Sequence, residues 1–169
     1  MKKICLTLIL SSTLGYAIAS ETAYAYITNS DDNSYTQCTV KKNVIDTTTC
    51  KIIKPQGSGA LNSPVGITLD DHNAYITNYG NNSYTQCSVK HDMIDANSCK
   101  TITPSGKGSL NEPHGISILG NYVYIVNMKD STYTQCKHGN EGIESNTCVT
   151  NSVPNLNQKA SSAFITFSK

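Results

Sequence analysis

The sequence predicts an all-β fold built from repeated four-stranded units, and two observations carry this prediction. The stretch "AYITNSDDNSYTQC" that starts at Ala25 returns as "AYITNYGNNSYTQC" at Ala74 and, more diverged, as "VYIVNMKDSTYTQC" at Val123, a step of 49 residues each time. Each copy also consists of short β-branched and aromatic stretches bounded by Asn, Gly, Pro and Ser. No stretch has the apolar period of a helix, so three small antiparallel sheets are expected.

The first 19 residues are typical of a secretory signal peptide. Lys2 and Lys3 precede a short apolar run, and Ala17 and Ala19 form an A-x-A cleavage signal. The apolar run is too short to cross a bilayer, which takes about 20 apolar residues. We therefore expect export to the periplasm or the medium, cleavage after Ala19, no membrane span, and a single β-repeat domain over residues 20–169.

Each unit is expected to contain four strands. In the copy of the repeat that starts at Ala74 these are "AYITN", "SYTQCSV", "CKTIT" and, after the Pro/Gly/Ser-rich stretch "PSGKGSLNEPHG", the strand "GISIL". The units span about 20–65, 66–114 and 115–169. Ile67, Ile116 and Ile165 are also 49 residues apart. The chain is thus expected to begin in the middle of a repeat, and a last strand near 163–168 would complete the first unit.

The cysteines follow the same repeat. In every unit two of them lie 12 residues apart on either side of a turn-like stretch, where a hairpin would bring them face to face. The six cysteines outside the signal peptide, which contains Cys5, allow 15 pairings, but one bridge per unit is the simplest for an exported repeat protein. The spacing lacks the C-x-x-C pairs of a zinc site. The predicted disulfides are Cys38–Cys50, Cys87–Cys99 and Cys136–Cys148.

Composition excludes one class of partner. The chain has 13 Lys+Arg and 12 Asp+Glu, all of its basic residues are lysines, and it has no tryptophan. Nucleic-acid binding needs clustered positive charge, which a nearly neutral and arginine-free chain does not supply. We therefore expect no nucleic-acid partner.

The order "P-x-G-I-x-L", "A-Y-I-T-N", "N-S-Y-T-Q-C-x-V" and "I-D" resembles the YVTN/NHL-type β-propeller repeat. The resemblance covers nearly all of the chain after the signal peptide, and it implies a ring of four-stranded blades. This repeat is longer than usual for that family, and its outer hairpin carries an added cysteine pair. Three units are also fewer than the 4–8 blades of most propellers.

Three arrangements remain open at this point. Two chains can close a six-bladed ring, each lending its last strand to the other, which predicts a homodimer. The chain can also form an open three-blade arc, as a remnant of a longer propeller. The alternative fold is a β-trefoil, because that fold also consists of three repeats of four strands in about 150 residues.

Candidate ligand-binding residues are few. His114 and Glu112 in "NEPHGI" precede an inner strand, where the central channel of a propeller would open, and propeller lactonases of this family use acidic and histidine side chains there. Val65 and Ala163 occupy the positions equivalent to His114, so no ring of histidines is repeated. The acidic pairs Asp31–Asp32 and Asp70–Asp71 lack the spacing of a calcium loop. We expect no catalytic residue, metal or cofactor.

Two tyrosine series also repeat, Tyr26, Tyr75, Tyr124 and Tyr35, Tyr84, Tyr133. Tyrosine combines an apolar ring with a polar tip, so core packing between blades is expected for both series, although one of them could face a partner or a sugar. The function that these patterns favour is a secreted binding or scaffold module for a protein partner. The alternatives are a β-trefoil lectin for a glycan and a propeller hydrolase of lactonase type.

Overall fold

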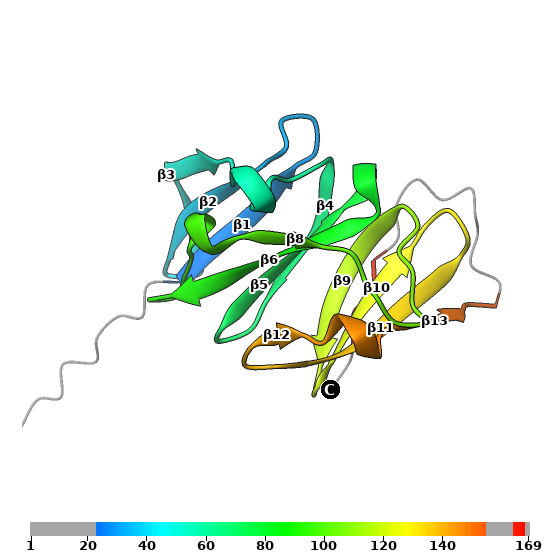
Figure 1. The fold of residues 1–169 in the computed structure, drawn as a ribbon. Helices are drawn as coiled ribbons and strands as arrows, with labels where there is room; N and C mark the ends of the chain where they lie inside the picture. The colour runs from blue at the N-terminus through cyan, green and yellow to red at the C-terminus, as the bar shows by residue number, and fades with distance from the viewer. Residues whose placement is uncertain (1–22, 155–163, 168–169) are drawn as a thin grey trace, which may run out of the picture.

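The structure is a computed structural model that describes residues 23–154 and 164–167, and it is all-β (Figure 1). Its strands form three antiparallel sheets that follow one another along the chain, and we call them the first, second and third blades. The predicted signal peptide, residues 1–19, lies outside the described residues. The first blade has the strand order β1 (Ala23–Asn29), β2 (Ser34–Lys41), β3 (Val44–Ile53).

The second and third blades contain an inner strand that has no counterpart among the described residues of the first blade. In the second blade β4 (Pro64–Leu69) precedes β5 (Asn73–Asn78), β6 (Ser83–Lys90), β7 (Met93–Ile94) and β8 (Lys100–Ile102). In the third blade β9 (Pro113–Leu119) precedes β10 (Tyr122–Asn127), β11 (Thr132–Gly139), β12 (Gly142–Ile143) and β13 (Val149–Ser152). Four short 3-10 helices connect these strands: η1 (Gly57–Gly59), η2 (Tyr79–Asn81), η3 (Ala96–Ser98) and η4 (Ser145–Thr147).

This topology confirms the propeller-like fold with three blades. Among the described residues every β-ladder lies within one blade, and the blades meet through side chains from their sheet faces. A β-trefoil would instead pair strands of different repeats in a shared barrel, so the β-trefoil alternative is wrong. Figure 1 shows the blades one after another, from the blue first blade to the yellow and orange third blade.

The predicted disulfides are all present, at Cys38–Cys50, Cys87–Cys99 and Cys136–Cys148. The outer hairpin of the second blade is less regular than the sequence indicates. β7 has only two residues, and η3 follows it, because the Asp95 side chain accepts the backbone N–H of Asn97 and so stabilises a tight turn. The strand β8 then returns beside β6 with Gln86 opposite Lys100, which brings Cys87 and Cys99 together.

The repeated Asn of "AYITN" or "YIVN" explains part of the hexapeptide "NSYTQC". The Asn78 side chain donates to Oγ of Ser83 at 3.1 Å and to Oγ1 of Thr85 at 2.9 Å. Asn29 and Asn127 make the same pair of hydrogen bonds in their own blades. Since buried amides must be hydrogen-bonded, this contact ties the two central strands of each blade at one end.

Each blade presents two different faces, because successive side chains of a strand point to opposite sides of the sheet. We call the side toward the next blade the forward face and the opposite side the rear face. Forward faces carry the tyrosines, such as Tyr75 and Tyr84, whereas rear faces carry small or aliphatic residues and a cysteine, such as Ile76 and Cys87. The first and second blades pack through a cluster that includes Tyr35, Leu61, Ala74, Ile76 and Cys87. The second and third pack through Tyr75, Tyr84, Val123, Ile125 and Cys136.

Both tyrosine series therefore lie on forward faces. Tyr35, Tyr75 and Tyr84 are fully buried under the following blade, which confirms the core prediction for these three, whereas Tyr26 is only partly buried against the second blade. The idea that one series points outward toward a ligand is wrong for these residues. Tyr124 and Tyr133, on the third blade, are only partly buried, because no described blade follows them.

The inner strands β4 and β9 approach each other closely at Gly66. A Cβ atom on Gly66 would lie 2.3 Å from the carbonyl oxygen of His114, so only glycine fits at this point. Thr77 holds the two strands together: its hydroxyl donates to the His114 carbonyl at 2.6 Å and accepts the Gly66 N–H at 2.7 Å. Thr28 binds the carbonyl of Val65 at 2.7 Å in the same way between the first two blades.

The predicted last strand is not paired in the single chain. Residues 163 and 168 lie outside the described residues, and Phe164–Phe167 form no strand with any described residue. Phe167 instead contacts Tyr124 of the third blade, with ring centroids 5.0 Å apart. Completion of the first blade by this segment, through exchange between two chains, therefore stays a prediction.

Within residues 23–154 and 164–167, no helix has the length and hydrophobicity that a membrane crossing requires.

Replacing Cys87 and Cys99 together by alanine is expected to lower the free energy of unfolding by about 3 kcal/mol or more. The bridge closes a 13-residue loop, for which the chain-entropy model predicts about 3 kcal/mol, and both cysteines are buried, so lost packing adds to this. Urea unfolding of the purified domain measures the effect. The Cys38/Cys50 double variant is the matched control, because it opens a loop of the same length whose Cys50 is exposed. An equal or larger loss in that control would contradict the packing contribution.

Candidate functional site

The predicted pair of Glu112 and His114 lies at the junction of the second and third blades, where β9 begins. The His114 side chain is only 9% exposed and packs edge-on against Tyr79, with ring centroids 5.4 Å apart. Its Nδ1 atom has no hydrogen-bond partner among the described residues. The imidazole is thus enclosed by protein instead of being presented openly at a channel.

Glu112 is engaged with other groups. Its carboxylate lies 3.8 Å from Nζ of Lys129, and its backbone N–H donates to the Asn82 side chain at 2.8 Å. No hydrogen bond or ion pair joins it to His114 in the described part of the chain. The structure therefore places the two residues near each other without a hydrogen bond or ion pair between them, and their role as ligands stays a prediction.

Burial dominates the ionisation of His114. Desolvation lowers the pKa of the imidazole, and the negative charge of Glu112 opposes this by raising it. The net direction is downward, so the folded protein favours the neutral ring. A neutral buried histidine at a blade junction is a packing element whose protonation opposes folding.

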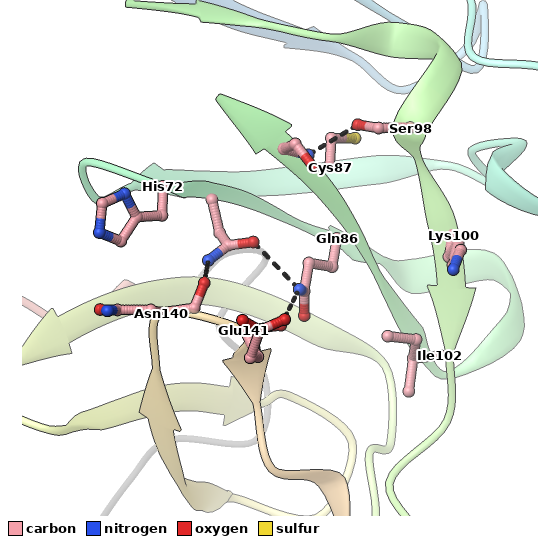
Figure 2. A pocket seen from close by; sticks show the side chains of 10 residues that line it. His72, Gln86, Cys87, Ser98, Lys100, Ile102, Asn140 and Glu141 are labelled. Carbon is pink, nitrogen blue, oxygen red and sulfur yellow. Dashed lines mark hydrogen bonds between the residues drawn. The ribbon is translucent and has the colours of Figure 1, made fainter. Parts of the chain in front are cut away.

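A polar groove that the sequence does not reveal lies between the second and third blades, with a volume of about 280 Å³ (Figure 2). We call it the second groove. Its floor and walls come from β5, β6, η3 and β8 of the second blade and from the β11–β12 turn of the third. The lining residues are His72, Asn73, Gln86, Cys87, Ser88, Ser98, Lys100, Ile102, Asn140 and Glu141.

Two amide side chains hold the β11–β12 turn against the second blade. The Gln86 amide donates to Oδ1 of Asn73 at 3.1 Å and to the Glu141 carbonyl at 2.9 Å, and its oxygen accepts the N–H of Ile143 at 3.2 Å. The Asn73 amide donates to the Asn140 carbonyl at 3.0 Å. These bonds give the second groove a fixed wall, because each of the two amides bonds to the β11–β12 turn and they bond to each other (Figure 2).

An equivalent groove lies on the first blade, next to the second, with a volume of about 350 Å³. We call it the first groove. It is lined by Tyr24, Gln37, Cys38, Thr39, Thr49, Lys51 and Met93. All but one of these positions are one repeat away from a lining residue of the second groove: Tyr24 from Asn73, Gln37 from Gln86, Cys38 from Cys87, Thr39 from Ser88, Thr49 from Ser98 and Lys51 from Lys100. The site is thus a property of the repeat.

Each groove contains a lysine without a charged partner. Lys51 and Lys100 are exposed, and neither forms an ion pair with any described residue. By contrast, Lys41 and Lys90, on the neighbouring hairpins, are paired with Asp46 and Asp95. In Figure 2 Lys100 lies on the opposite side of the second groove from His72 and Asn140. The two free ammonium groups are available to an acidic ligand.

Asp70, of the acidic pair Asp70–Asp71, stabilises the blades through hydrogen bonds. Oδ1 of Asp70 accepts the backbone N–H groups of His72 and Asn73, at 2.8 and 2.7 Å, and so closes the turn before β5. Its Oδ2 accepts the Tyr75 hydroxyl at 3.3 Å and lies 3.4 Å from Nδ1 of His138 of the third blade. No group of three His, Cys, Asp or Glu side chains suited to a metal ion occurs within the described residues.

No family model matches this chain, and no curated protein matches it either. Solved structures with a similar fold do exist. One is a functionally unknown protein from Desulfotomaculum acetoxidans DSM 771, with 20% sequence identity, a TM-score of 0.50, and coverage of 78% of this chain and 38% of that one. Another, from Bacteroides uniformis ATCC 8492, is described as a "putative 6-phosphogluconolactonase", with 10% identity, a TM-score of 0.52, and coverage of 81% of this chain and 42% of that one.

These similarities show the fold alone, because both identities are low. This chain spans about two fifths of the length of each of the two structures. The likeness therefore supports the propeller-like architecture, whereas membership of the YVTN/NHL family remains an expectation from sequence resemblance.

Replacing His114 by valine, the residue at the equivalent position 65, is expected to make folding stability less dependent on pH. Because the folded-state pKa of His114 is lowered, the unfolded chain binds the proton more readily, and stability present above the unfolded pKa of about 6.5 is lost as pH falls below it. Unfolding midpoints in urea at pH 7.5 and pH 5.0 measure this. The drop should be smaller in His114→Val than in the parent protein, and His91→Val, an exposed hairpin residue, is the control. An unchanged drop in His114→Val would contradict the assignment.

Proposed function

We propose that this chain is an exported, propeller-like module that binds an acidic segment of a partner protein in the polar grooves of its blade junctions. The observation that carries the proposal is the repetition of the groove. The first and second grooves share a glutamine, hydroxyl side chains and an unpaired lysine at equivalent positions. An extended peptide that crosses both grooves can present one carboxylate to Lys51 and another to Lys100.

The lining of the grooves favours a protein segment over other ligands. Pockets for small organic molecules are lined mainly by apolar and aromatic side chains, whereas the second groove is lined mainly by amide, hydroxyl and charged groups and includes no Tyr, Phe or Trp. A sugar ring would find no aromatic face in the second groove on which to stack, whereas Tyr24 lines the first groove. Carboxylates suit the free ammonium groups of Lys51 and Lys100, because charge-assisted hydrogen bonds are stronger than neutral ones.

Export is part of this proposal. Three disulfides require an oxidising compartment, which is what the predicted signal peptide would provide. A homodimer, which the sequence also predicts, is compatible with the function, because residues of junctions within one chain line both grooves.

The hydrolase of lactonase type remains a second candidate because the Bacteroides structure shares the fold. A direct assay distinguishes it from the binding module. Hydrolysis of 6-phosphogluconolactone by the purified protein, lost in His114→Ala or Glu112→Ala, would favour the hydrolase.

Replacing Lys51 and Lys100 together by glutamine is expected to weaken binding of an acidic peptide by about tenfold, since each exposed charge pair contributes up to about 1 kcal/mol. The probes are three hexapeptides, one rich in Glu, one rich in Lys and one neutral, titrated into the isotope-labelled exported domain. The Glu-rich peptide should shift the NMR signals of the Gln37 and Gln86 side-chain amides, and the other two peptides should not.

Lys54→Gln is the matched control, because Lys54 is an exposed lysine outside both grooves. It should bind the Glu-rich peptide as the parent does, apart from a small loss of net charge. Equal shifts with all three peptides, or equal losses in the control and the double variant, would show that the grooves do not select acidic segments.

A further inference from the structure

The rear face of the first blade exposes side chains that the other two blades bury. Ile27 is 50% exposed, whereas its equivalents Ile76 and Ile125 are fully buried. Ile45 is 43% exposed, whereas its equivalents Ile94 and Ile143 are 6% and 9% exposed. In the second and third blades it is the preceding blade that covers these positions. The first blade thus presents an apolar surface already shaped to accept a forward face.

The third blade presents the matching surface. Tyr124 and Tyr133 lie on its forward face with ring centroids 6.2 Å apart, and both are only partly buried. Their equivalents Tyr75 and Tyr84 are completely buried against the rear face of the next blade. The rear face of the first blade and the forward face of the third are therefore the same two kinds of surface that pack on each other at both junctions within the described chain.

The segment Phe164–Phe167 lies where the inner strand of a following blade would lie. Phe167 contacts Tyr124, and the equivalent pairs, Ile118 with Tyr75 and Leu69 with Tyr26, each belong to one core cluster at an inner-strand junction. In those cases the inner strand also pairs with the next strand of its own blade. Phe164–Phe167 has no such pairing in the described chain, so its backbone groups are available to a further strand.

The first blade offers that strand. Among the described residues β1 pairs with β2 along one edge and with no strand along the other, whereas β5 and β10 pair with β4 and β9. In the complete blades Ile67 lies opposite Ile76 and Ile116 opposite Ile125. One further step of the repeat places Ile165 opposite Ile27, and Phe167 opposite Ala25, of another chain.

We propose that two copies of this chain close a six-bladed ring around a two-fold axis. The forward face of each third blade packs on the rear face of the other copy's first blade, and Phe164–Phe167 becomes the inner strand that completes this blade by strand addition. Six blades fall within the 4–8 of known propellers. A second copy is the occupant because both surfaces are the ones already complementary at the junctions inside the chain, and rotation by 180° makes the two contacts identical.

Light scattering on the oxidised, exported chain and on three variants tests this proposal. The parent should have twice the mass of one chain. Ile27→Asp places a charge on the rear face of the first blade, and Phe167→Asp places one on the segment Phe164–Phe167. Each variant alone should therefore be monomeric. His91→Asp places the same charge on an exposed residue of the turn between β6 and β7 of the second blade, outside both grooves, and should remain dimeric. Thermal unfolding and intact disulfides confirm that each variant is folded.

Mixing the two monomeric variants gives a second, independent readout. Ile27→Asp keeps its forward segment and Phe167→Asp keeps its rear face, so the mixture should form a heterodimer through one intact contact, with a dissociation constant higher than that of the parent dimer. A monomeric parent, a dimer that survives Ile27→Asp, a mass that grows with concentration beyond two copies, or no association in the mixture would overturn the proposal. The peptide titration does not depend on this outcome, because neither Ile27 nor Phe167 lines a groove.

Discussion

The structure depends on one contact, the packing of a tyrosine-bearing forward face on an aliphatic rear face. A small sheet with an apolar face has to bury that face against another element, so each blade needs a neighbour. Tyr75 and Tyr84 meet Val123, Ile125 and Cys136 at one junction, and Tyr35 meets Ala74, Ile76 and Cys87 at the other. The two faces of a blade differ, so the contact has a direction and can be repeated along the chain, and it leaves one face of each kind unmatched.

The hexapeptide "NSYTQC" encodes this contact position by position. Asn33 and Asn82 adopt left-handed backbone conformations, and their side chains accept the N–H of Ser63 and Glu112 just before the next inner strand. The Ser and Thr bind the Asn of the preceding strand, the Tyr fills the forward face, and the Cys forms the disulfide. Gln86 reaches the following blade. Because its side chains alternate between the two faces of the sheet, this strand stabilises its own blade and also contacts the next one.

The grooves arise from the same packing of one blade on the next, which is why no sequence motif predicts them. Gln86, Ser88, Ser98 and Lys100 are spread over β6, η3 and β8 of one blade, and the opposite wall belongs to Asn140 and Glu141 of the next. His114 and Glu112 had a better sequence signal, a histidine and a carboxylate two residues apart before an inner strand. The fold does not join these two side chains, because the imidazole is buried against Tyr79 while Glu112 lies toward Lys129.

The sequence by itself determined the all-β class, the 49-residue register, the blade-like units and the pairing of the six cysteines, because strand alternation and a fixed period constrain local structure directly. It also marked Ile165 as the third member of the inner-strand series. Only the tertiary structure showed that both tyrosine series share one face, that the two lysines with no charged partner lie in equivalent grooves, and that Phe167 lies against Tyr124 while β1 keeps an open edge. These features arise where blades meet. Such contacts join residues of different repeats, so the sequence pattern of a single repeat does not predict them.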